Sequence, residues 1–168
     1  MYDGEVGGSP DGFPVLDEVD VGNLDGIKEE RPLVPPAKDV KLQIKRVNAR
    51  SNETRTWRWL SVGLQLVDGV KVGEDIKYKG MYVNTDNMCY FADLEAYPEV
   101  TKDKRYLGKL ADLQRATGTV GLPINDKFLE ILQDKIVLGT IRQKFDEYQG
   151  EKVNVVGYLK PLPTDMLV

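Results

Sequence analysis

Two tryptophans, Trp57 and Trp59, lie two residues apart in a stretch typical of a β-strand, with Arg55 and Arg58 beside them. Side chains alternate between the two faces of a strand. Both indole rings are therefore expected on one face with Arg55, and the even-numbered apolar residues of 60–66 on the other. Aromatic rings next to cations can stack nucleobases. The pattern predicts a stacking platform for nucleobases or, alternatively, the inner layer of a small barrel.

Basic residues are concentrated just before and within this stretch. Residues 38–58 contain seven Lys or Arg side chains against two acidic ones. Such an excess near aromatic rings favours salt-dependent contacts with phosphates, although a solvated strand face would have the same composition. The residues predicted to contact phosphates are Lys41, Lys45, Arg55, Arg58, Lys77 and Lys79. For Lys77 and Lys79, the alternative is a solubilising role on an edge strand.

The composition argues against catalysis. The chain has no histidine and a single cysteine, Cys89. The commonest general base, the usual metal ligand and every histidine-dependent triad are therefore absent. Asp93, Glu95 and Glu99 lie close together but lack the spacing of a calcium-binding loop. We expect a protein that is not an enzyme and has neither a cofactor nor a metal site.

The net charge of −4 conceals an uneven distribution along the chain. Residues 1–30 carry nine acidic side chains and one basic, whereas residues 31–168 carry 18 acidic and 22 basic. Residues 1–36, rich in Gly, Pro and Asp, are predicted to form an extended arm that is disordered in isolation. Its densest apolar cluster, Phe13, Val15 and Leu16, would dock on a neighbouring subunit, or the arm would mask a basic surface.

The remaining residues, 37–168, are expected to form one domain. Apolar alternation begins near Ala37 and is followed by a polar turn at 48–53. The predicted elements are strands over 37–47, 54–66 and 75–83, a helix over 106–117 ended by Gly118, a short helix from an Asn125 cap to Gln133, and a hairpin of strands over 136–145 and 152–159. No element is predicted over 84–104. The order indicates a mainly β fold, a five-stranded OB-like Greek-key barrel with a helical insert between strands 3 and 4.

Several segments carry a family resemblance. They are Pro35 to Val47, Ser51 to Gly69 with its Leu-Val-Asp-Gly end, Leu107 to Gly118, and Leu138 to Tyr158 with Tyr148-Gln149-Gly150. In these segments the chain resembles a phage-encoded family, long catalogued as of unknown function, that is considered to consist of OB-fold single-stranded DNA-binding proteins. It departs from the family in lacking glycine at Pro35-Pro36-Ala37 and in carrying its acidic segment at the N-terminus.

The resemblance implies a sequence-nonspecific single-stranded DNA-binding protein of a replication or recombination module. Through its N-terminal arm, the protein is expected to form a homo-oligomer or to join other assembly subunits. No apolar run approaches the roughly 20 residues of a membrane span, and the start does not have the pattern of a signal peptide. We therefore expect an intracellular protein, in the host cytoplasm if phage-encoded. The alternative is a structural or assembly protein, such as a phage particle component.

Overall fold

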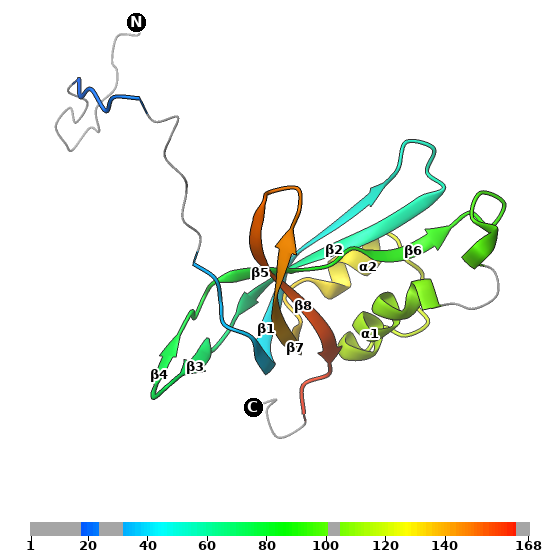
Figure 1. Ribbon diagram of the computed structural model, residues 1–168. Helices are drawn as coiled ribbons and strands as arrows, with labels where there is room; N and C mark the ends of the chain where they lie inside the picture. Colours follow the sequence, from blue (N-terminus) through cyan, green and yellow to red (C-terminus); the bar gives the residue numbers. More distant parts are fainter. Residues whose placement is uncertain (1–17, 24–31, 101–104, 164–168) are drawn as a thin grey trace, which may run out of the picture. The chain divides into compact units, whose positions relative to one another are not determined.

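The computed structural model describes residues 18–23, 32–100 and 105–163 (Figure 1). The chain divides into two units, Met1–Pro32 and Leu33–Val168. The predicted docking residues Phe13, Val15 and Leu16 lie outside the described residues. Within the part of the chain that is described, no helix has the length and apolar character needed to cross a membrane.

The second unit is built mainly from β-strands. In chain order the elements are β1 (Ala37–Ser51), β2 (Trp57–Leu66), β3 (Val70–Val72), β4 (Asp75–Lys77), β5 (Tyr82–Thr85), β6 (Met88–Ala92), the 3-10 turns η1 (Pro98–Val100) and η2 (Arg105–Leu107), α1 (Gly108–Thr117), α2 (Asp126–Leu132), β7 (Ile136–Asp146) and β8 (Glu151–Lys160). The predicted mainly β fold is confirmed.

Five strands close into a barrel in the order β1-β7-β8-β5-β2, and β2 pairs again with β1. The β5–β8 pairing is parallel, whereas the other pairings are antiparallel. Strand β2 pairs with β5 near Leu64 and with β6 near Arg58. Strands β5 and β6 therefore follow one another along the same edge of β2, interrupted at Asp86 and Asn87.

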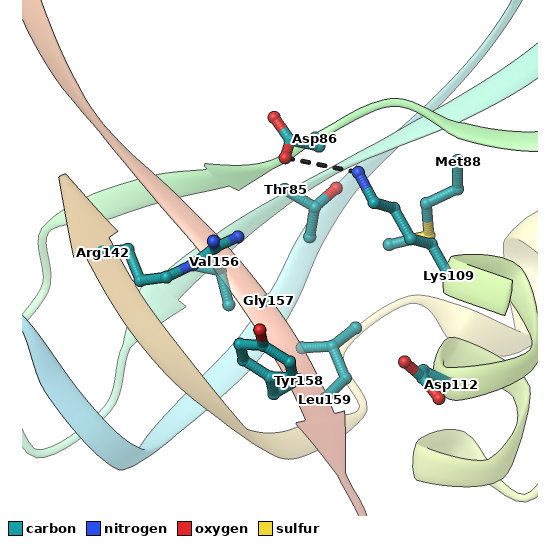
Figure 2. Close-up of a pocket in the computed structure, with 10 residues that line it drawn as sticks. All are labelled: Thr85, Asp86, Met88, Lys109, Asp112, Arg142, Val156, Gly157, Tyr158 and Leu159. Atoms are coloured by element: carbon teal, nitrogen blue, oxygen red, sulfur yellow. Dashed lines mark hydrogen bonds and ion pairs between the residues drawn. The ribbon is translucent and has the colours of Figure 1, made fainter. Parts of the chain in front are cut away.

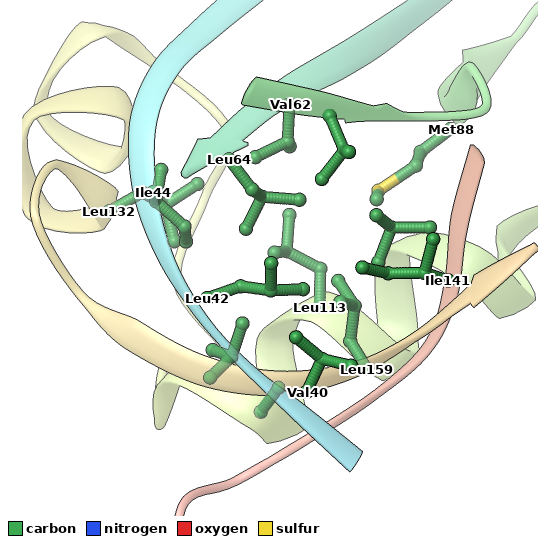
Figure 3. Close-up of a cluster of buried hydrophobic side chains, with 14 of the residues drawn as sticks. Val40, Leu42, Ile44, Val62, Leu64, Met88, Leu113, Leu132, Ile141 and Leu159 are labelled. Atoms are coloured by element: carbon green, nitrogen blue, oxygen red, sulfur yellow. The ribbon is translucent and has the colours of Figure 1, made fainter. Parts of the chain in front are cut away.

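The predicted apolar alternation fills the barrel interior. Leu60, Val62, Leu64 and Leu66 of β2 are all buried, as the sequence pattern predicts. They meet the apolar residues of β1 and β7 and the inward side chains of both helices (Figure 3). Their burial supplies the main stabilisation of the fold, at roughly 25 cal/mol for each Å² of apolar surface removed from water.

The end of α1 and the start of α2 lie where the sequence predicts them. Helix α1 stops at Gly118, whose φ of 71° is the left-handed conformation that glycine adopts without strain. Helix α2 begins after Asn125, whose side chain accepts a hydrogen bond from the Phe128 N–H at 2.9 Å. Leu113 of α1 and Phe128 of α2 are fully buried, so these caps orient the helices against the core.

The third strand was predicted at the wrong place. Residues 70–77 form the small β3–β4 hairpin outside the barrel, and the barrel strand begins only at Tyr82. Tyr78 and Gly80 have φ values of 68° and 83°, which are incompatible with a continuous strand over 75–83. Strand β6 lies in the segment for which no element was predicted.

The polar turn also starts later than expected. Strand β1 continues to Ser51, because Asn48, Arg50 and Ser51 pair with β2 across the hairpin. A register shift between Ile44 and Arg46 changes the alternation of β1 at this point.

Candidate nucleic-acid interface

Trp57 and Trp59 lie on the outer face of the barrel. Both are half-buried, and they point away from the interior face that carries Leu60. Trp59 lies between Arg50 on β1 and Cys89 on β6, and Trp57 lies opposite Ala92. The alternative of an inner barrel layer is therefore wrong for these rings, because alternation along β2 reserves the interior for the leucines and Val62.

Two tyrosines hold the Trp57 ring. The Tyr97 ring packs against it edge-on, with ring centroids 5.0 Å apart and planes at 68°. Tyr106 of η2 lies 6.2 Å away at 44°. Asn52 connects the β1–β2 turn to this cluster, because its side-chain amide donates to the Tyr97 hydroxyl at 3.3 Å and its Oδ1 accepts from the backbone N–H of Trp57 at 3.1 Å. The aromatic cluster is thus positioned before any ligand arrives.

A cavity of about 380 Å³ opens beside these rings. We call it the aromatic pocket; it is lined by Trp57, Trp59, Asn87, Cys89, Tyr106 and Lys109. The Cys89 thiol is buried and donates a hydrogen bond to the Phe91 carbonyl at 3.4 Å. Burial raises the pKa of Cys89, which keeps the thiol neutral. The pocket therefore combines flat aromatic surfaces with one exposed ammonium group, that of Lys109.

A second cavity, of about 300 Å³, lies between α1 and the strands β5 and β8. We call it the basic pocket (Figure 2). The charged and aromatic residues of its lining are Asp86, Lys109, Asp112, Arg142 and Tyr158, and Gly157 also lines it. Lys109 lines both cavities, so the two pockets adjoin at this side chain.

Asp86, which lines the basic pocket, forms ion pairs with two lysines. Its carboxylate oxygens lie 3.4 Å from Lys109 Nζ and 3.1 Å from Lys144 Nζ. Burial alone would raise the pKa of Asp86. The hydrogen bond from Lys144 and the charges of Lys109 and Lys144 together lower that pKa below its usual value. Asp86 is therefore ionised at neutral pH, and one carboxylate is shared by two ammonium groups.

Arg55, predicted on the tryptophan face of the strand, lies before β2 begins, and Arg58 packs on the other face. Arg55 lies in the turn before β2 with a φ of 57°, and its carbonyl accepts a hydrogen bond from Arg58 Nε at 3.2 Å. The Arg58 guanidinium lies 4.6 Å from the centroid of the Phe91 ring, on the opposite face of the hairpin. Arg55 and Arg58 remain close to the β1–β2 turn, while Arg50 takes the position beside Trp59.

The four lysines that were predicted to contact phosphates do not lie beside the tryptophans. Lys41 and Lys45 form ion pairs with Asp68 at 3.9 Å and Asp134 at 3.4 Å. Lys77 and Lys79 are exposed in and after β4, and in Figure 1 the β3–β4 hairpin lies at the opposite end of the barrel from the β1–β2 turn. Among the described basic residues, Arg50 pairs with Trp59 across the hairpin and Lys109 lines the aromatic pocket.

Sequence reasoning did not single out several residues that line the two pockets or contact their lining residues. These residues are Arg50, Tyr97, Tyr106, Lys109, Arg142, Lys144 and Tyr158. No local signal marks most of them, because they reach the site through strand pairing and helix packing. Within the described residues, no three potential metal-ligating side chains of His, Cys, Asp or Glu come together.

No protein-family model matches this chain, and no curated protein is significantly similar to it in sequence.

Proposed function

We propose that this protein binds single-stranded DNA with little sequence preference, as a non-enzymatic component of a phage replication or recombination module. The observation that carries the proposal is the aromatic pocket, in which half-buried Trp57 and Trp59 line an open cavity beside Lys109. Every base has a π-face, so stacking on indole rings is tolerant of sequence and is worth roughly 1–3 kcal/mol per base.

We further propose that the barrel is of the OB-like Greek-key type. Strands β5 and β6 would act as one interrupted third strand, because both pair along the same edge of β2. Helices α1 and α2 would then be the insert before β7, and the parallel β5–β8 pairing would close the barrel. Small barrels of this class commonly bind oligonucleotides.

The roles of the side chains follow from their positions. Trp59 would stack a base, since it lies on the open outer face between β1 and β6. Trp57 would extend the platform, with its ring held by Tyr97 and Tyr106. Arg50 and Lys109 would contact the phosphates on either side of the stacked bases. Phosphate contacts of this kind weaken as salt competes for the strand.

The test measures binding of labelled oligo-dT by fluorescence anisotropy at low and high salt, for a variant carrying Trp57→Ala and Trp59→Ala. Loss of stacking should weaken binding by at least about 1 kcal/mol at all salt concentrations. The matched control carries Trp57→Phe and Trp59→Phe, which retains the aromatic faces and should bind more tightly than the alanine variant. Oligo-dT affinity that is unchanged in a folded alanine variant would exclude the platform.

A second candidate is a structural or assembly role. Phe145 is 57% exposed and Tyr148 is fully exposed, both on the β7–β8 hairpin. Large exposed aromatic side chains are enriched at protein–protein contacts. If assembly is the function, replacing both by serine should lower the oligomer mass in light scattering, and the wild-type protein should show no oligo-dT binding.

A further inference from the structure

The basic pocket contains an arginine whose charge is not neutralised. Among the described residues, no carboxylate pairs with the Arg142 guanidinium, which lies 5.5 Å from the centroid of the Tyr158 ring. A Cβ built at Gly157 would lie 3.1 Å from Arg142 Nη2, so the guanidinium lies close above the backbone of this glycine. Arg142 therefore passes over the backbone of β8 to reach the ring. A guanidinium stacked on a ring keeps its N–H donors free for an anion.

Tyr158 is held in a strained conformation. It has a φ of 52° within strand β8, and its side chain is 65% exposed. A left-handed backbone is unfavourable for tyrosine, which gains little from burial at this position. The β7–β8 pairing shifts register between Leu138 and Thr140, where β8 has one residue more than β7, so the strain at Tyr158 coincides with a bulge in β8. Strain of this kind is concentrated at ligand sites.

The charges around the basic pocket favour an anion. Lys109, Lys144 and Arg142 contribute three positive charges, and Asp86 compensates one of them. The other acidic residue of the lining, Asp112, is already paired with Arg115 at 2.6 Å. A phosphate group would therefore find uncompensated donors, and the Tyr158 ring beside them offers a surface for a base.

Lys109 connects this cavity to the aromatic pocket, because it lines both. We infer, on the basis of the proposed single-stranded DNA binding, that the basic pocket takes a further nucleotide of the same strand. Its phosphate would lie between Arg142, Lys144 and Lys109, and its base would pack against Tyr158. The DNA strand would thus leave the tryptophans toward β8 and α1, and not along Lys41 and Lys45 of β1.

Two variants, Arg142→Ala and Tyr158→Gly, test this assignment by their binding of labelled oligo-dT. Arg142→Ala should weaken binding and reduce the slope of log K against log salt by about 0.7, the value for one phosphate contact in single strands. The control Lys127→Ala removes the same charge from an exposed position on α2 that lines neither pocket. It should leave the affinity and the slope close to those of the wild type.

Tyr158→Gly separates binding from folding. Glycine adopts a positive φ without strain, so the melting temperature should be retained or raised. Loss of the base contact should weaken oligo-dT binding by roughly five-fold or more. If Arg142→Ala and Tyr158→Gly both bind oligo-dT like the wild type, the bound DNA strand does not enter the basic pocket. If the wild-type protein fails to bind oligo-dT at all, the proposed function itself is wrong.

The mononucleotide dTMP distinguishes a strand subsite from an isolated nucleotide pocket. If the basic pocket binds one nucleotide of a DNA strand, most of the affinity comes from the nucleotides bound in the aromatic pocket. Free dTMP should then compete with oligo-dT only at far higher concentration. Competition by dTMP at concentrations similar to those of oligo-dT would contradict the proposal that the basic pocket binds a nucleotide of the same DNA strand.

Discussion

Asp86 is the residue at which the two pockets are electrostatically linked. Its carboxylate holds Lys109 and Lys144 at 3.4 and 3.1 Å, and both lysines belong to the proposed phosphate contacts. A carboxylate beside an anion site competes with the ligand for the same cations. In the free protein, however, the carboxylate prevents repulsion between the two lysines. Asp86 is therefore expected to stabilise the fold slightly and to weaken DNA binding.

Asp86→Asn tests this balance. The pKa of Asp86 in the folded state is below its ordinary value of 3.8, so its stabilising contribution is complete above pH 3.8 and is lost as pH falls through the lowered folded pKa. At pH 7 the variant should lose less than about 1 kcal/mol in urea unfolding, because the ion pairs are partly exposed. The difference should disappear at low pH.

The same variant should bind oligo-dT more tightly at low salt, since both lysines become free for phosphates. Weaker oligo-dT binding by Asp86→Asn would indicate that the carboxylate positions the two lysines for the phosphates and does not compete with the DNA.

At the level of elements, the close approach of β7 to its neighbours decides how the barrel closes. Gly139 of β7 is buried and lies close to side chains of both β1 and β8. A Cβ built at Gly139 would lie 2.7 Å from Val156 Cγ1 and 2.9 Å from Leu42 Cδ1. The absence of a side chain therefore lets three strands pack around one point, and the adjoining bulge in β8 places Tyr158 outside the barrel.

Gly139→Ala should destabilise the protein by about 1–3 kcal/mol, because the added methyl overpacks a filled core. Gly108→Ala at the start of α1 is the matched control, since a Cβ there meets nothing within 4 Å. Thermal unfolding of the two variants checks the prediction. Equal melting temperatures would contradict the view that β7 closes the barrel without room for a side chain.

For the whole molecule, the uneven distribution of charge is the dominant feature. The complete chain has a net charge of −4, but residues 31–168 carry 22 basic against 18 acidic side chains. An acidic segment tethered to a basic domain is present at a high effective concentration and can compete with DNA. The same segment could instead dock on a second subunit.

Deletion of residues 1–30 separates the two possibilities. If the segment masks the domain, oligo-dT affinity should rise, and more at low salt than at high salt, because the competition is electrostatic. If the segment tethers subunits, light scattering should give a lower mass for the shortened protein. A deletion that alters neither measurement would contradict both roles.

The sequence by itself determined the local features of this protein. The alternation of β2, the Gly118 and Asn125 helix caps and the closing hairpin follow from residues near each other in the chain, which is why they could be predicted. The division between an acidic segment and a basic remainder is likewise a property of composition.

Only the tertiary structure decided which cations lie beside the tryptophans. Lys109 is 52 positions from Trp57 in the sequence, and it reaches the aromatic pocket only because α1 packs against the closed barrel. Lys41 and Lys45, nearer to Trp57 in sequence, are instead paired with Asp68 and Asp134. Strand pairing and barrel closure join residues that are distant in the chain, so local patterns carry no information about these neighbours.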